Sequence, residues 1–139
     1  MISTTLIVYC LVAGGVTLVA VTFLHELLGR YIRVSRDMPA AIMEPTSVGW
    51  FFLNYVMEYL FIVAVPTFAY SIFVVVLPLS GIRPALAAAV LAFTLGAVPG
   101  VLALSVRVKL SMVYLMYILF GVLMKLAAVL AIIGYLYSL

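Results

Sequence analysis

Charged residues are scarce in this sequence. Only 8% of its 139 residues are Asp, Glu, Lys or Arg, whereas 69% are hydrophobic. An ordinary soluble domain has about 25% charged and about 45–50% apolar residues. A chain with so few charges cannot cover its own surface in water, which excludes a soluble domain. No stretch remains for a second domain, so we expect residues 1–139 to form a single transmembrane domain.

Cysteine and histidine are also nearly absent, since the chain has only Cys10 and His25. One cysteine cannot form an intrachain disulfide or a cysteine-based metal motif. One histidine supplies neither both axial ligands of a bis-histidine haem nor a metal cluster. We therefore predict no metal site within one chain, and the sequence identifies no cofactor. Only a dimer, in which each copy of the chain contributes its His25, could supply both histidine ligands of such a haem.

Hydrophobic runs fill most of the chain. A spanning helix needs about 20 mainly apolar residues, and such stretches occupy residues 5–24, 50–77, 84–105 and 111–136. Short connections force consecutive helices to run antiparallel and side by side. The predicted fold is therefore all-α, an integral membrane four-helix bundle of up-down-up-down topology. A short interfacial segment is expected between the first two helices.

The basic residues indicate an orientation rather than a nucleic-acid site. The first connection carries three arginines and the third carries Arg107 and Lys109, whereas the second carries only Arg83. By the positive-inside rule, the first and third connections face the cytoplasm and both termini face outside. Because no transit peptide is visible, we expect a multi-pass protein of a bacterial or archaeal inner membrane, in contact with membrane lipids.

The stretch after the first span mixes apolar residues with Arg30, Arg33 and Arg36. This pattern suits a short helix that continues from the membrane and lies at the headgroup surface. Two interpretations stay open. Either the arginines are solvated at an extended cytoplasmic end of the first helix, or they bind anionic lipid or a partner protein.

The second run is too long for a simple span. Residues 50–77 would form a helix of about 42 Å, whereas the hydrocarbon core is about 30 Å thick. The helix must tilt, kink or protrude, and Pro66 near its middle predicts a kink. Trp50, Tyr55 and Tyr59 at one end are typical of an aromatic belt at the membrane interface.

Small residues recur at every fourth position of the third run, at Ala88, Ala92, Gly96 and Gly100. Such a row lets two helix backbones approach closely in lipid. Internal packing between neighbouring helices is the first explanation of the row, and an oligomer interface is the alternative. The row could pack against grooves formed by glycines of the first and fourth runs, namely Gly14, Gly15, Gly121 and Gly134.

Two ionisable residues lie within apolar runs, Glu58 in the second and Lys125 in the fourth. Each costs about 2.5–3.5 kcal/mol at the bilayer centre, so they should face inward, pair or reach the interface. Their expected positions differ by about 9 Å along the helix axes, which a lysine can span if the helices tilt. The alternative places Glu58 just below the headgroups, with Asn54 one turn earlier extending a polar strip toward water.

Lys125 lies near the middle of its helix, in a four-residue row with Tyr117 and Gly121. An intramembrane lysine is a functional-site hypothesis by default. Three roles stay open for it. The first role is a structural pair with another charged residue of the chain. The second is binding of a proton or an anionic ligand, and the third is a salt bridge to another subunit.

His25 and Glu26 follow the first run directly. Their ordinary interpretation is an interfacial polar cap. The alternative is an acid and base pair of an enzyme that acts on lipid at the cytoplasmic surface. The chain offers no nucleophile paired with a base and no glycine-rich phosphate loop, so an enzyme is the less favoured class.

Two sequence stretches resemble a known group of proteins. They are the aromatic and glycine-containing stretch 23–31 and the segment Arg107–Leu110, which is followed by Tyr114 and Tyr117. Together with the spacing of the spans, they are similar to a family of small uncharacterised four-span bacterial membrane proteins. That family has no established activity, so the resemblance implies the topology alone.

The leading functional hypothesis is a non-catalytic small subunit or scaffold of a larger membrane protein complex. It rests on the lack of a catalytic pattern and on the overlong second helix, which other protein chains would accommodate. The alternative is a small homo-oligomeric transporter or channel, because four spans are few to enclose a pathway alone. In that case Glu58 and Lys125 would line the route, with Pro66 and Pro99 as helix irregularities.

Overall fold

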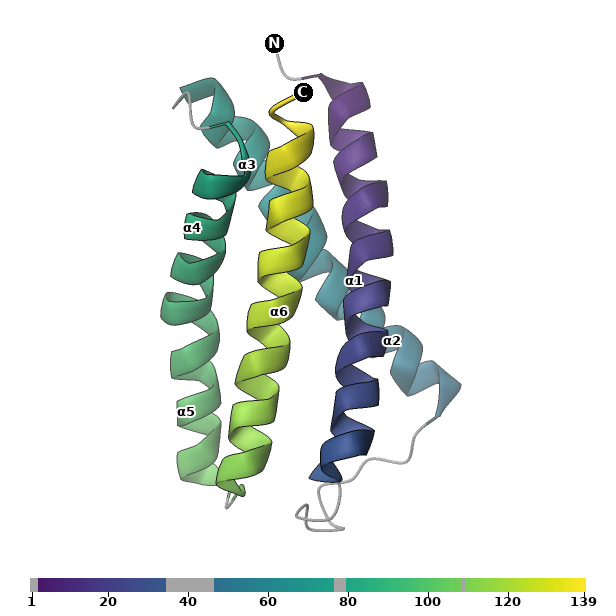
Figure 1. The fold of residues 1–139 in the computed structure, drawn as a ribbon, viewed down its shortest axis with the longest axis vertical. Coiled ribbons are helices and arrows are strands. Elements are labelled where there is room, and N and C mark those ends of the chain that lie inside the picture. The colour runs from purple at the N-terminus through teal and green to yellow at the C-terminus, as the bar shows by residue number, and fades with distance from the viewer. Residues whose placement is uncertain (1–2, 35–46, 77–79, 109) are drawn as a thin grey trace.

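The computed structural model describes residues 3–34, 47–76, 80–108 and 110–139. These residues form helices and no strand (Figure 1). Four helices are long and apolar enough to cross a membrane: Thr4–Ile32, Val48–Val76, Ile82–Arg107 and Met112–Leu136. The predicted all-α fold of a multi-pass membrane protein is confirmed.

The four helices alternate in direction. In chain order the elements are α1 (Thr4–Ile32), α2 (Val48–Glu58), η3 (Tyr59–Ala64), α3 (Val65–Val76), α4 (Ile82–Ala92), η4 (Phe93–Ala97), α5 (Val98–Arg107) and α6 (Met112–Leu136). The segments η3 and η4 are π-helical turns inside the second and third long helices. The start of α1 and the end of α6 lie at the same end of the bundle (Figure 1), as the up-down-up-down topology requires.

Serine residues begin three of the long helices. The side-chain oxygens of Ser3, Ser47 and Ser111 each accept a hydrogen bond from the backbone N–H three residues later. Such a cap satisfies one of the N–H groups that the first helical turn leaves without a partner, and it is worth about 1 kcal/mol. The caps explain why the helices begin where they do, within a few residues of the predicted starts.

α1 is longer than the first apolar run. It continues past residue 24 to residue 32, so His25 and Arg30 belong to the spanning helix itself. The helix ends where Arg33 adopts the left-handed conformation, with a φ of 57°. α1 therefore has an extended end, whereas solvation of its arginines and their binding to anionic lipid or a partner both stay predictions. The remainder of the expected interfacial segment, including Arg36, lies outside the described residues.

Each π-helical turn ends two residues before a proline, η3 before Pro66 and η4 before Pro99. A proline inside a helix lacks the N–H of the regular ladder, and its ring crowds the carbonyl four residues earlier. A wider turn accommodates this crowding. In η3 the N–H of Val65 accordingly bonds to the carbonyl of Leu60, five residues back. The irregularity predicted at Pro66 therefore takes the form of a π-helical turn.

α6 is the central helix, packed against α1 and α4. We call the half of the bundle that contains the chain termini the closed half. Its contacts are tight, because Gly14 of α1 admits the side chain of Val63, and Gly134 of α6 admits Ala85. The largest fully buried side chains, which lie in this half and at the bundle's middle, are Leu18, Ile133, Val63, Val129, Thr67 and Cys10.

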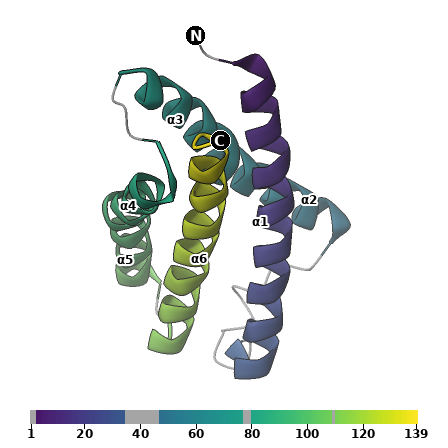
Figure 2. The same ribbon diagram turned by 45° about the horizontal axis from the view of Figure 1, so that its top comes forward.

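The opposite half, which we call the open half, is less tightly packed because α2 stands apart. No residue of α2 is buried. The Val48 end of α2 projects away from the bundle in both views (Figures 1 and 2). The packing difference between the two halves leaves room in the open half for the cavity described below.

The small-residue row of the third helix does not pack against the other helices as expected. Around Gly96 and Gly100, a Cβ atom would meet nothing within 4 Å. Ala92 is also exposed. The buried alanines of this helix are instead Ala85 and Ala89, on a neighbouring face that meets α6. Internal packing is therefore wrong for Ala92, Gly96 and Gly100, whereas Ala88 is half-buried, and an oligomer interface stays a prediction.

Candidate functional site

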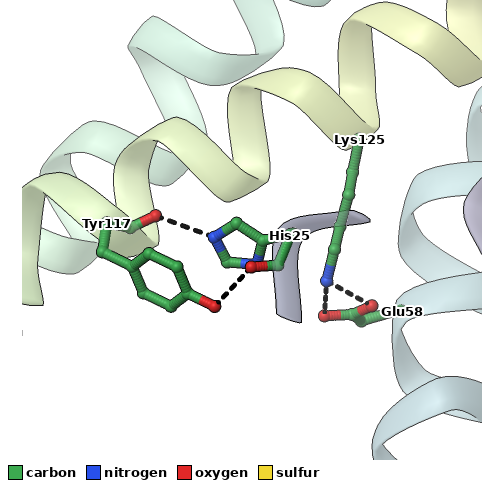
Figure 3. A network of polar contacts seen from close by, with 4 residues as sticks. All are labelled: His25, Glu58, Tyr117 and Lys125. Atoms are coloured by element: carbon green, nitrogen blue, oxygen red, sulfur yellow. Dashed lines mark hydrogen bonds and ion pairs between the residues drawn. The ribbon is translucent and has the colours of Figure 1, made fainter. Parts of the chain in front are cut away.

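An ion pair joins the second and fourth long helices inside the open half. The Nζ atom of Lys125 donates to both carboxylate oxygens of Glu58, at 2.6 and 2.7 Å (Figure 3). The Lys125 side chain is 8% exposed and that of Glu58 is 24% exposed. The direct pair that the sequence left open is therefore formed within one chain. Its charges lie too deep for full hydration, so each depends on the other for compensation.

A polar cavity of about 320 Å³ leads to this pair. It lies between α1, α2 and α6. The polar residues of its lining are Thr22, His25, Glu26, Asn54, Tyr55, Glu58, Tyr114 and Lys125, together with the indole of Trp50. The size is at the lower end of the range of about 300–1,000 Å³ found for small-molecule sites. The cavity therefore suits a small solute or several water molecules.

Two tyrosines hold the second helix in the orientation that turns Glu58 toward α6. The hydroxyl of Tyr55 donates to the carbonyl of Gly15, and that of Tyr59 donates to the carbonyl of Leu11, each at 3.3 Å. The ring of Tyr59 also lies directly over Gly15, where a Cβ would come within 2.9 Å of a ring carbon. These two tyrosines therefore contact α1 through their hydroxyl groups, and their place in an interfacial aromatic belt stays a prediction.

His25 and Tyr117 connect α1 to α6 (Figure 3), and His25 also lines the cavity. Tyr117 Oη donates to the carbonyl of His25 at 2.9 Å. The Nε2 atom of His25 lies 3.1 Å from the carbonyl of Tyr117. Since a carbonyl oxygen only accepts, Nε2 carries the proton. The two rings stack with centroids 4.0 Å apart. His25 thus acts in helix packing, and its Nδ1 atom is the ring nitrogen not used in this pair of bonds.

Two glycines make this contact between α1 and α6 possible. A Cβ at position 121 would collide with the His25 ring, and one at position 29 would collide with the Tyr117 hydroxyl. Gly121 of α6 and Gly29 of α1 therefore each receive the ring of the opposite helix. Gly121 lies one turn before Lys125, so the same helix face holds both the packing contact and the ion pair.

The remaining predicted polar residues fall into two groups. Asn54 and Glu26 line the cavity together with His25 and the ion pair. The arginines do not, since Arg30 lines a separate groove between α1 and α2 and Arg33 forms the C-cap of α1. The sequence interpretation did not include Trp50 and Tyr114 among the cavity residues. The one sequence feature that could have indicated them is helical spacing. Trp50 lies four residues before Asn54, and Tyr114 lies three residues before Tyr117, so each pair shares a helix face.

One buried polar atom on the cavity wall lacks a partner. Thr22 Oγ1 forms no hydrogen bond within the described part of the chain, although it is shielded from the surroundings. Thr22 also lines the groove on the other side of the same wall. An unpaired buried hydroxyl costs about 1–3 kcal/mol, so a site of this kind favours a bound water or a polar ligand atom.

The chemistry available in the cavity is that of one ion pair, a second carboxylate at Glu26 and several neutral hydrogen-bonding groups. Among the described residues, no three His, Cys, Asp or Glu side chains lie close enough together to hold a metal ion. Glu58 presents a carboxylate that can accept a proton or a cation, and Lys125 presents an ammonium that can bind an anion. These groups can bind a charged solute, provided that it replaces the contacts that the pair makes with itself.

Comparison of the chain with protein-family models, with curated proteins and with solved structures gave no match.

Proposed function

We propose that the protein is a small membrane transporter in which a charged solute binds in the polar cavity at Glu58 and Lys125. The observation that carries the proposal is the placement of the ion pair at the inner end of a cavity rather than in a closed core. Beyond the pair, toward the closed half, the described helices pack around fully buried side chains such as Val63 and Val129. A site that is reached from one side only is what one state of an alternating-access transporter requires.

Stability alone is a weak reason for such a pair. Replacing a buried ion pair by apolar residues of similar volume is often neutral or stabilising, whereas removing one partner costs about 3–5 kcal/mol. A chain with 69% hydrophobic residues has many ways to fill this space without charge. The retained charges, and the partial exposure of Glu58 to the cavity, favour a role in binding.

The expected binding mode is an exchange of partners. A solute with a cationic and an anionic group would take Glu58 and Lys125 as its two counter-charges and separate them from one another. Asn54 and His25 line the same cavity and would supply neutral hydrogen bonds. Small zwitterions such as free amino acids and betaine are the solute class that matches this pair of charges.

The orientation and assembly are part of the same proposal. The positive-inside rule places the open half, with Arg30 and Arg107, on the cytoplasmic side of a bacterial or archaeal inner membrane. Because four spans rarely enclose a pathway alone, the working form would be a homo-oligomer. The exposed small residues Ala92, Gly96 and Gly100 offer a surface on which a second copy could pack closely.

The test is uptake of labelled small zwitterions into liposomes that contain the purified chain, under an imposed pH gradient and membrane potential. Wild-type protein should give uptake above protein-free liposomes, and Lys125→Met and Glu58→Gln should abolish it. Arg83→Gln, at the other end of the bundle, is the matched charge-removing control and should leave uptake unchanged. Equal uptake by wild type and Lys125→Met would remove the ion pair from the mechanism.

A second candidate is a non-catalytic subunit of a larger membrane complex. The same exposed row of small residues favours it, because close helix packing in lipid can serve an unrelated chain as well as a second copy. Gentle solubilisation of native membranes followed by native mass determination separates the two. Unrelated chains at fixed stoichiometry would support the subunit, whereas a pure homo-oligomer would support the transporter.

A further inference from the structure

A second hollow lies between α1 and α2, on the other side of the wall that borders the polar cavity. It is a groove of about 790 Å³. Thr22, Glu26, Phe51 and Tyr55 line both spaces. Most of the other groove residues are apolar, and they include Val19, Phe23, Leu27, Val48 and Phe52. All five of these are exposed, so the groove opens onto the outer surface of the bundle.

The groove has the length and the polarity gradient of one membrane leaflet. Along α1 its lining runs from Val19 to Arg30, which is about 16 Å at the rise of an α-helix. One leaflet contributes about half of a hydrocarbon core of about 30 Å. The polar members Glu26, Arg30 and Ser47 gather at the end of the groove where α1 finishes and α2 begins. A lipid in its ordinary orientation would have its headgroup at this level and its chain along the apolar part.

Glu26 and Arg30 are placed to receive a headgroup that carries both signs of charge. They are four residues apart on α1, the spacing at which Glu and Arg commonly pair. Within the described part of the chain, however, neither forms an ion pair, since Lys125 with Glu58 is the pair found there. Both side chains are exposed and both line the groove. One acid and one base side by side complement an ammonium and a phosphate.

We propose that this groove binds one phospholipid of the ethanolamine type, with its phosphate on Arg30, its ammonium group on Glu26 and an acyl chain along Val19, Phe23 and Phe52. The lipid would fill the space that keeps α2 away from the neighbouring helices. It would also cover the outer side of the Phe51 and Tyr55 wall of the polar cavity. This site does not depend on the transport proposal, because it requires binding alone.

The test of the groove is native mass spectrometry of the full chain in a lipid-free neutral detergent, titrated with phosphatidylethanolamine. Wild-type protein should retain one lipid at concentrations where Leu27→Trp, which fills the groove, retains at least about tenfold less. Leu24→Trp is the matched control, because Leu24 is exposed on α1 and lines none of the hollows described above. Equal lipid retention by the two tryptophan variants would overturn the site.

The headgroup assignment has its own variants, which lie on the surface and are not expected to disturb folding. Arg30→Gln should weaken binding of phosphatidylethanolamine and of phosphatidylglycerol by about tenfold or more, the usual effect of losing one charged hydrogen bond. Glu26→Gln should weaken binding of the ethanolamine lipid alone. Arg83→Gln should change neither. If Glu26→Gln and wild type bind both lipids equally well, the ethanolamine headgroup is the wrong ligand.

Discussion

His25 and Tyr117, 92 positions apart in the sequence, each hydrogen-bond to the backbone carbonyl of the other while their rings stack at a centroid distance of 4.0 Å. This reciprocal contact joins the first and last helices in the open half, where α2 contributes little packing. It places the histidine ring in a fixed position beside the polar cavity. The contact therefore both stabilises the bundle and shapes one wall of the candidate site.

Tyr117→Phe should lower the free energy of unfolding by about 1 kcal/mol, because it removes the 2.9 Å hydrogen bond to the His25 carbonyl and keeps the ring. The measurement is denaturant unfolding in detergent, followed by circular dichroism. Tyr135→Phe is the matched control, since Tyr135 is an exposed tyrosine of the same helix. A loss as large in the control as in Tyr117→Phe would contradict the proposed role of the hydroxyl.

Gly121→Ala should destabilise the protein by about 1–3 kcal/mol, because the new methyl group would occupy the position of the His25 ring. Gly96→Ala should be neutral or stabilising, since its surroundings are open and alanine favours the helix by about 1 kcal/mol. Comparing the thermal stabilities of the two variants checks this. Similar stabilities would show that α1 and α6 are not held in the described register.

Lys125→Met should destabilise the protein by about 3 kcal/mol, at the low end for a broken buried pair because Glu58 keeps 24% exposure. The double variant Glu58→Gln with Lys125→Met should recover most of the loss, because it leaves no charge without a partner. Denaturant unfolding of the three proteins under one set of conditions checks both statements. A double variant less stable than Lys125→Met would mean that the charges stabilise the fold by more than their mutual compensation.

Gly100→Leu should weaken self-association severalfold while leaving the monomer folded, because the side chain would point away from the other helices of the same chain. Energy transfer between donor-labelled and acceptor-labelled copies in liposomes measures the association. Leu102→Met on the same helix is the control, since Leu102 is exposed and large already. Unchanged association in Gly100→Leu would place any oligomer interface elsewhere.

The number, direction and approximate bounds of the helices could be predicted, because in a membrane the length of an apolar run and the spacing of loops decide them. The Glu58 and Lys125 pair could be predicted as one of several outcomes. Both charges must be compensated in an apolar environment. Their expected depths differed by about 9 Å, a gap that a long lysine side chain can span if the helices tilt. Sequence patterns are reliable where burying a charge or leaving an apolar run in water costs several kcal/mol.

The rotation of each helix about its own axis could not be predicted. The four-residue row of the third helix shows that one face is small, but packing in lipid lets such a face meet either a neighbour or another chain. The structure packs Ala85 and Ala89 inside and leaves Gly96 exposed. Likewise, Tyr55 has an apolar ring and a polar tip that suit both a membrane interface and a carbonyl on α1. Only the assembled bundle distinguishes these alternatives.

In the proposed transport mechanism, small solutes reach the ion pair from one side of the membrane only. The most direct measurement is the reaction of Asn54→Cys, in a Cys10→Ala background, with a charged thiol reagent that cannot cross the bilayer. The reagent is applied separately to each face of oriented vesicles. We predict rapid labelling from the face that exposes the first connection and none from the face of the termini. Equal labelling from both faces, or no labelling from either, would contradict the account.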